Sequence, residues 1–568
     1  MHRIARGRIA AVGVAVIFGL VGLLTVPSGF VGAKSSGPSK HVLLISVDGL
    51  HASDLAQCEA NNECPNLASL AGYGTTYSQV KTSEPSDSAP GLMALVTGGD
   101  PKLTGVYYDD AYDRTMFTAP AQTASGTQDC SGTPGTETMY FENVDVGAPT
   151  FSNPSGTRPI MNGAIDPAQL AYAKQNGKCS PVTPNNFLRT NSIFSVAHQA
   201  GLYTAWADKH PVYNQEIAGH GTPNSVDDPF NTEINADLIP PSLVDTRGNT
   251  VNFPLPNPDG TGPYFITDSV GDTESYDQIK VDAILNEIDG RNSTNTKAAP
   301  VPAIFGMNFQ TVSVAQKLVD PIQSCVRSGD ATGCDPSYVP GGYEPGTLKF
   351  TPQLQGAVES VDSAIGSMID ELRSQGLLGS TRIIITAKHG QSPIDPSKLN
   401  LVGHAETTVL TKAGVTPAVV TDDDIALIWL QDQSQTSQAV QLLQADKSGA
   451  DTAKVDYILS GSALAQQFNS PLQDPRTPDL IVQPVEGTIY SHSSAKVMEH
   501  GGFAEDDTHV AMLVVDGANL ISKTPVGTTV DTPVRTAQVA PTILADLGLN
   551  PNKLDSVRIE GVQVLPTS

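Results

Sequence analysis

The stretch HVLLISVDGL (residues 41–50) decides how the rest of the sequence is interpreted. Apart from Ser46, its residues from 42 to 47 are apolar, and Asp48 and Gly49 follow directly. A short apolar run that ends at a turn signal is typical of a buried strand in a parallel sheet. Because ligands of α/β sheets bind at the carboxyl ends of strands, we expect Asp48 to present a carboxylate there.

A second segment, SAPGLMALVTG (residues 88–98), predicts a helix that opens near Pro90. Ser88 stands at its start and is either the N-cap of this helix or a nucleophile. The two roles are compatible, since a helix N-terminus attracts anionic groups such as phosphate. An acid at a strand end and a hydroxyl at a helix N-terminus are the groups that metal-assisted phosphoryl transfer needs.

Further along the chain, predicted strands and helices alternate, which favours a three-layer α/β sandwich around a mostly parallel central sheet. Gly, Pro, Ser and Thr are frequent between about residues 110 and 190, where we expect a loop insertion. An inserted cap subdomain is expected at about 395–490, with a strand of its own at 425–430. The remaining strands are expected at 203–206, 303–309, 382–386 and 511–515, and the main helices at 192–199, 276–288, 354–375 and 538–548.

The charge of the chain restricts its partners. Its 568 residues include 33 Lys and Arg against 59 Asp and Glu, which gives a net charge of −26. Such a surface repels DNA and RNA at long range, so no nucleic-acid polymer is expected as a partner. A small anionic substrate at a local cationic site remains compatible with this charge.

The N-terminus predicts export. Three arginines at positions 3, 6 and 8 precede an apolar stretch at 9–26 and the small-residue sequence VGA at 31–33. This pattern predicts a signal peptide at 1–33, a catalytic domain at 34–568, and a secreted, periplasmic or extracellular protein. The alternative is an uncleaved leader that anchors the protein in a membrane, and no membrane contact is expected otherwise.

Six cysteines are consistent with export and allow fifteen pairings. We expect pairing between near neighbours, Cys58 with Cys64 and Cys325 with Cys334. Cys130 and Cys179 would then form the third disulfide.

Other candidate site residues also follow predicted strands. His389 comes in the sequence KHG (388–390) after the strand at 382–386, and Gln310 follows the strand at 303–309. His500 precedes the late strand at 511–515. Two acid–imidazole pairs could supply further donors to a metal site, although loop residues of these types are often simply solvated. These pairs are Asp208 with His210, and Asp507 with His509.

In this order, the motifs resemble the type I phosphodiesterase/nucleotide pyrophosphatase family of the alkaline phosphatase superfamily. The matching features are Asp48, Ser88 with Pro90, the sequence TGGDP at 97–101, HG at 389–390, HG at 500–501 and the closing helix. The resemblance implies Ser88 as the nucleophile and one or two divalent ions, of zinc in this family. It implies metal ligation by Asp48, Ser88, His389 and His500, and a small-molecule phosphoester as substrate.

Four positions depart from the family pattern. Lys388 replaces a metal-binding Asp, and Gln310 and Val314 replace the Asp and His of the second metal site. A protonated amine cannot bind a cation, but Lys388 could supply a fixed positive charge beside phosphoryl oxygens. Gly91 replaces an Asn that contacts the substrate phosphate in the pyrophosphatases.

Three functions therefore compete. The first is an exported, metal-dependent hydrolase of phosphoric esters, similar to a phosphodiesterase or nucleotide pyrophosphatase, with a Ser nucleophile. The second is a hydrolase of the same superfamily that acts on a sulfate, phosphonate or lipid phosphoester. The third is a non-catalytic exported binding protein with an eroded metal site, for which Gln310, Val314 and Lys388 are the evidence.

Overall fold

A computed structural model describes residues 38–61, 63–139, 144–147, 156–259, 265–319, 341–446, 452–493 and 495–567. The expected signal peptide and the expected Cys325–Cys334 disulfide lie outside these ranges. Within them, no helix has both the length and the apolar character needed to span a bilayer.

An eight-stranded sheet forms the centre of the structure, in the order β21-β2-β20-β13-β1-β12-β8-β9. Five neighbouring strands, β13, β1, β12, β8 and β9, are parallel, whereas β20 runs antiparallel to β13 and β2 antiparallel to β20. The sequence predicted a mostly parallel sheet, which is confirmed. The strands are β1 (His41–Val47), β2 (Thr75–Tyr77), β8 (Ala205–Asp208), β9 (Asp228–Asn231), β12 (Ile304–Phe309), β13 (Thr381–Thr386), β20 (Met512–Asp516) and β21 (Thr528–Val530).

The central position of β1 explains its apolar sequence. It pairs with β12 on one side and with β13 on the other, so both of its edges are hydrogen-bonded. Every residue from Val42 to Leu50 is buried. Because the neighbouring strands run in the same direction, their carboxyl ends bring Asp48, Gln310 and Lys388 to one edge of the sheet.

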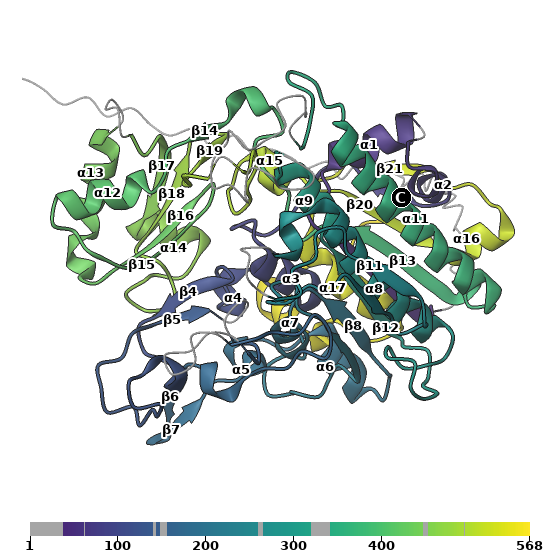
Figure 1. Cartoon of the computed structure of the whole chain (residues 1–568), viewed down its shortest axis with the longest axis horizontal. Helices are drawn as coiled ribbons and strands as arrows, with labels where there is room; N and C mark the ends of the chain where they lie inside the picture. Colours follow the sequence, from purple (N-terminus) through teal and green to yellow (C-terminus); the bar gives the residue numbers. More distant parts are fainter. Residues whose placement is uncertain are drawn as a thin grey trace, which may run out of the picture. The chain divides into compact units, whose positions relative to one another are not determined.

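Two groups of helices pack with this sheet. The first group comprises α8 (Val270–Ile288), α9 (Thr311–Lys317) and α11 (Pro352–Ser374), and Figure 1 shows α8 and α11 lying over the sheet. The second comprises α3 (Ser88–Thr97), α6 (Ile193–Gln199) and α17 (Val539–Asp546), which contact one another. Apolar residues of α11 recur at helical spacing, from Leu354 to Leu372, and are buried. The expected three-layer α/β sandwich is therefore present.

A second sheet is built from the segment after β13. It has four antiparallel strands in the order β15-β16-β18-β17 and buries a hydrophobic cluster of its own. The boundaries of a cap subdomain at 395–490 stay a prediction. The elements of this segment are α12 (Ala405–Lys412), β15 (Pro417–Asp422), β16 (Ala426–Leu430), α13 (Thr436–Ala445), β17 (Val455–Ser460), α14 (Gly461–Gln467) and β18 (Leu480–Pro484).

Short elements complete the described part of the chain. Two hairpins, β4–β5 and β6–β7, lie in the expected loop insertion. The other strands are β3 (Val80–Lys81), β4 (Asp110–Asp113), β5 (Thr136–Met139), β6 (Tyr172–Gln175), β7 (Lys178–Pro181), β10 (Ser242–Val244), β11 (Thr250–Asn252), β14 (Asn400–Leu401), β19 (Thr488–Ile489) and β22 (Val534–Arg535). The other helices are α1 (Ala52–Asn61), α2 (Pro65–Tyr73), α4 (Pro101–Thr104), α5 (Pro184–Phe187), α7 (Pro211–Glu216), α15 (Glu505–Thr508), α16 (Gly517–Ser522) and α18 (Asp555–Glu560).

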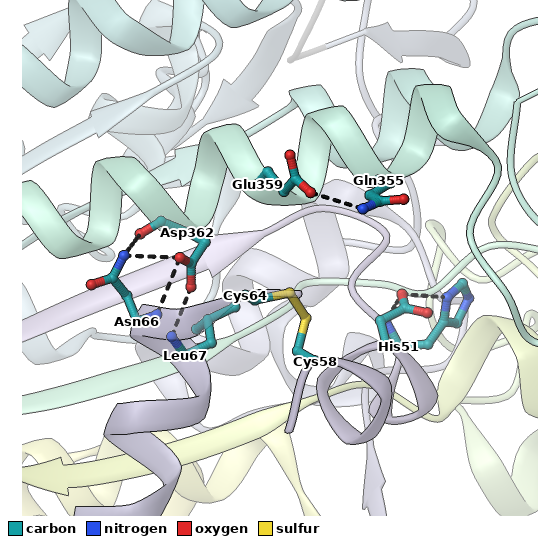
Figure 2. The surroundings of a disulfide bond; sticks show 9 residues. His51, Cys58, Cys64, Asn66, Leu67, Gln355, Glu359 and Asp362 are labelled. Carbon is teal, nitrogen blue, oxygen red and sulfur yellow. Dashed lines mark hydrogen bonds and ion pairs between the residues drawn. A yellow bond between two sulfur atoms is a disulfide. The ribbon is translucent and has the colours of Figure 1, made fainter. Parts of the chain in front are cut away.

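Two of the predicted disulfides, Cys58–Cys64 and Cys130–Cys179, are confirmed. The first joins the end of α1 to the start of α2 (Figure 2). The N-cap residue of α2 makes no side-chain hydrogen bond to the helix. Instead, the buried Asp362 of α11 accepts hydrogen bonds from the backbone N–H groups of Asn66 and Leu67, at 3.2 and 2.7 Å. A side chain of α11 therefore caps the N-terminus of α2.

This cap predicts a loss of stability in Asp362→Ala. The substitution leaves the first N–H groups of α2 buried without an acceptor, so the free energy of unfolding should fall by about 1–3 kcal/mol. The matched control is Asp370→Ala on the same helix, where the carboxylate is 78% exposed and pairs with Arg373. This control should change the free energy by less than about 0.5 kcal/mol. Equal shifts of the two variants in denaturant unfolding would contradict the capping role.

Candidate active site

Asp48 is the buried centre of the candidate site. Its Oδ2 accepts hydrogen bonds from the side-chain amides of Gln310 and of Asn308, the latter at 3.2 Å. The same oxygen lies 3.6 Å from Lys388 Nζ and 3.5 Å from His389 Nε2. Burial alone raises the pKa of Asp48, but the charges of Lys388, His389 and Lys209 lower this pKa well below its usual value.

Lys388 holds two buried carboxylates together. Its Nζ lies 3.6 Å from Asp48 Oδ2 and 3.5 Å from Asp208 Oδ1, and all three side chains are at most 1% exposed. The ammonium also lies 5.0 Å from the centre of the Tyr213 ring, which adds a cation–π contact. Asp208 accepts a further hydrogen bond from Trp206 Nε1 at 2.9 Å. The ends of β1, β8 and β13 are thus joined by one cation.

Ser88 is the first residue of α3, and Asp87 caps the helix by accepting a hydrogen bond from Ala89 N at 3.0 Å. The Ser88 side chain is therefore free of the N-cap role that its position also allowed. Its Oγ lies 3.2 Å from His389 Nε2 and accepts a hydrogen bond from Lys209 Nζ at 2.9 Å. Ser88, His389 and Asp48 form one connected cluster.

The hydrogen bonds of His389 fix its tautomer. Its Nδ1 lies 2.9 Å from the carbonyl oxygen of Gly390, which can only accept a hydrogen bond. In the neutral ring Nδ1 therefore carries the proton, and Nε2 is left as an acceptor toward Ser88 Oγ. His389 is consequently placed to take the proton of the Ser88 hydroxyl.

A cavity of about 310 Å³ borders this cluster. Its cationic or imidazole groups come from Lys209, His210, Lys317, His389, Lys496 and His500, and its carboxylates from Asp109, Asp268, Asp423 and Glu499. Burial and the surrounding cationic groups, among them Lys317 and His389, lower the pKa of His500 well below its usual value. His500 is thus neutral, and its ring centre lies 4.0 Å from that of His389.

A known protein family matches most of this chain. The family described as type I phosphodiesterase / nucleotide pyrophosphatase matches residues 42–292 and 337–508, which include β1, α3, β13 and His500.

The chain belongs to this family.

Two solved structures illustrate its fold. Wild-type alkaline phosphatase PafA has a TM-score of 0.53 at 12% identity, with 91% of this chain and 97% of that chain covered. Murine ectonucleotide pyrophosphatase/phosphodiesterase 5 has a TM-score of 0.50 at 12% identity, with coverages of 90% and 96%. A search of curated protein sequences finds no match. Membership of the type I phosphodiesterase / nucleotide pyrophosphatase family supports phosphoester hydrolase activity in general.

Members of the phosphodiesterase family typically depend on a divalent metal, but the residues around Asp48 do not fit one. Two ammonium groups, of Lys388 and Lys209, already contact the oxygens of Asp48 and Ser88 that would bind the ion. A metal cation bound there would be repelled by both of these positive charges. Asp48 Oδ1 accepts no hydrogen bond from any described residue and could bind an ion. A single oxygen, however, does not supply the three or four ligands that a zinc site needs. The expected zinc at Asp48, Ser88, His389 and His500 therefore disagrees with these contacts.

The second family metal site is also incomplete. Gln310 donates its amide N–H to Asp48, so it serves as a hydrogen-bond donor and not as a ligand. Val314 lines the cavity, and His500 Nδ1 lies 3.6 Å from Asp87 Oδ1. Candidate metal-ligand groups among the described residues lie elsewhere, at Asp145, His210 and Glu233 and at His404, Glu406 and Asp422.

The remaining sequence candidates separate into two groups. Asp208 joins the cluster through Lys388, whereas His210 turns to Asp145 and Glu233. Asp507 packs against Asp424, and burial together with Asp424 raises the pKa of Asp507 well above its usual value. His509 is 31% exposed and contacts Ser78 and Glu505, in a different surface pocket.

Gly91 shows why the family asparagine cannot occupy its position here. A Cβ atom added to Gly91 would lie 2.3 Å from the carbonyl oxygen of Lys388. Only glycine lets α3 approach the end of β13 so closely. The departures at Gly91 and Lys388 are therefore linked by packing.

Sequence reasoning missed Lys209, Asn308 and Asp87. Lys209 stands between two nominated residues, Asp208 and His210, but a lone lysine after a strand also has the pattern of a solvated residue. Asn308 interrupts the apolar sequence of β12, which was an available signal.

The bridge made by Lys388 predicts a pH-dependent stability defect in Lys388→Met. Without the cation, two buried carboxylates face each other and the free energy of unfolding at pH 7 should fall by about 3–5 kcal/mol. Burial would then raise the pKa of Asp48 in the folded variant above its unfolded value. Protonation therefore favours folding, and the deficit relative to wild type should shrink as the pH falls from 7 toward 4.

The control is Lys398→Met, which removes an exposed pair with Glu486 and should cost less than about 1 kcal/mol. Urea unfolding at several pH values measures both variants. A Lys388→Met deficit that is small at pH 7, or that grows at lower pH, would contradict the bridge.

Proposed function

We propose that this protein hydrolyses small phosphoesters, phosphodiesters in particular, with Ser88 as the nucleophile. The observation that supports this most is the position of Ser88 Oγ, 3.2 Å from His389 Nε2 and 2.9 Å from Lys209 Nζ. A hydroxyl between an acceptor imidazole and a cation can lose its proton to one and keep its negative charge beside the other.

In the proposed reaction, Ser88 Oγ forms a bond to phosphorus while the bond from phosphorus to the leaving oxygen breaks. The Ser88 proton passes to His389 Nε2, and the resulting imidazolium lies 3.5 Å from Asp48 Oδ2, which stabilises it. The leaving oxygen departs on the opposite side of phosphorus and takes a proton from water. The hydroxide that remains attacks the phosphoserine ester from that side, the bond from phosphorus to Ser88 Oγ breaks, and the His389 imidazolium returns its proton to Ser88 Oγ.

Two lysines supply positive charge in this proposal. Ser88 is fully buried, with Lys209 Nζ hydrogen-bonded to its Oγ, so a substrate must displace this ammonium. The displaced ammonium would then contact the phosphoryl oxygens, on which negative charge is spread in the transition state. Lys388, bound to Asp48 and Asp208, contributes fixed charge and keeps Asp48 ionised. Zinc at Asp48, Ser88, His389 and His500 is not part of this reaction.

The cavity limits the substrate to a small molecule. Its volume of about 310 Å³ is at the lower end of the usual range for small-molecule pockets. One solved structure of murine ectonucleotide pyrophosphatase/phosphodiesterase 5 is a complex with AMP. His500 borders the cavity and would contact the leaving group or a phosphoryl oxygen. Export is part of the proposal and is supported by the two disulfides, which form in oxidising compartments.

Ser88→Ala tests the nucleophile. With bis(p-nitrophenyl) phosphate as substrate, kcat/KM should fall by at least about a thousandfold, because no other group takes the place of the alcohol. The control Ser78→Ala removes a partly exposed hydroxyl that contacts Asp531, and it should keep full activity. Unchanged turnover in a folded Ser88→Ala would exclude the proposed nucleophile. A wild-type protein that turns over no aryl ester would instead support a binding protein.

Lys388→Asp tests whether the lysine replaces a metal, because it restores the acid found in the family. Turnover should fall by at least about tenfold. Added Zn²⁺ should not restore it, because the Lys209 ammonium still contacts the Ser88 oxygen that would bind the ion. Lys398→Asp, a surface change, serves as the control. A gain of zinc-dependent activity in Lys388→Asp would show that the centre is built for a metal ion.

A further inference from the structure

Three buried side chains form a separate cluster, and one of them, His210, lines the cavity. Asp145, His210 and Glu233 are at most 3% exposed, and one donor atom from each lies within 4.8 Å of the others. His210 Nδ1 lies 2.9 Å from Glu233 Oε1 and 3.9 Å from Asp145 Oδ2. The cluster joins the loop insertion to the ends of β8 and β9, the strands that His210 and Glu233 follow.

Two carboxylates in this cluster face one imidazole. No described residue donates a hydrogen bond to either oxygen of Asp145. The neighbouring Arg158 is paired with Asp237. A buried carboxylate without a hydrogen-bond donor is costly, and His210 Nδ1, at 3.9 Å from Asp145 Oδ2, is beyond hydrogen-bond distance.

We propose that Asp145, His210 and Glu233 bind one divalent first-row transition metal, such as Mn²⁺ or Zn²⁺. Two carboxylates and an imidazole suit such ions, whereas Ca²⁺ prefers oxygen ligands only. Ligands about 2.1 Å from a common ion lie about 3.0–3.4 Å apart, so the observed separations need only small side-chain shifts. The site shares no residue with the Ser88 cluster.

The ion would also position Lys209, a role that rests on the proposed function. Lys209 directly precedes His210, and its carbonyl oxygen accepts hydrogen bonds from Ile234 N at 2.9 Å and from the Tyr276 hydroxyl at 3.0 Å. A metal that joins His210 to Glu233 would fix the two segments, 209–210 and 233–234, against each other. Lys209 would then keep its place on Ser88 Oγ.

Metal binding by the full-length protein tests the site without any activity measurement. After removal of metals by a chelator, titration with Mn²⁺ or Zn²⁺ should give one bound ion per chain and a higher unfolding temperature. Asp145→Asn and His210→Ala should each weaken binding by at least about tenfold. Asp129→Asn, the same change at an exposed acid of the same insertion, should leave binding unchanged, and so should Asp48→Asn.

Several outcomes would overturn the proposal. One is a wild-type protein that binds neither ion and whose unfolding temperature is unchanged by both. Another is a folded Asp145→Asn that binds the ion as tightly as wild type. Loss of binding in Asp48→Asn, with binding kept in Asp145→Asn, would show that the metal binds at the Ser88 cluster. Because none of these readouts involves turnover, they stay distinct from a failure of the proposed hydrolysis.

Discussion

The ion bridge made by Lys388 is the constraint on which the candidate site depends. Parallel strands deliver the carboxylates of Asp48 and Asp208 to one edge of the sheet, where both are buried. Two buried negative charges are tolerated only with a compensating charge in contact with them. Lys388, at the end of β13, supplies that charge to both. In this chain, the compensating charge is an ammonium group that belongs to the protein itself.

The bridge also determines how the nucleophile is presented. Gly91 allows α3 to lie against the backbone of Lys388, and this contact sets the position of Ser88 at the start of the helix. His389, the next residue after Lys388, reaches the Ser88 hydroxyl. Lys209, the next residue after Asp208, reaches it from the other side. Two of the three bridge residues, Lys388 and Asp208, therefore each place the next residue in sequence on the same hydroxyl.

Much of this arrangement could be predicted from the sequence, because the buried strands have strong apolar patterns and Asp48 directly follows one of them. The antiparallel direction of β20 could not be, since strand direction depends on pairing between residues far apart in the chain. β8 lies at 205–208 and not at the expected 203–206, which places Asp208 in the strand and Lys209 at its end. The roles of Lys209 and Asp145 depend on contacts across more than fifty residues, and neither has a local signal.

In the proposed reaction two lysines, and no metal, supply the positive charge, Lys209 at Ser88 and Lys388 at Asp48. The most direct test is a crystal structure of the full chain with orthovanadate and excess Zn²⁺, with anomalous data at the zinc edge. We expect vanadium bonded to Ser88 Oγ, its oxygens in contact with Lys209 Nζ, and no anomalous peak between Asp48 and His389. A zinc peak there, with Lys388 displaced from Asp48, would contradict the account.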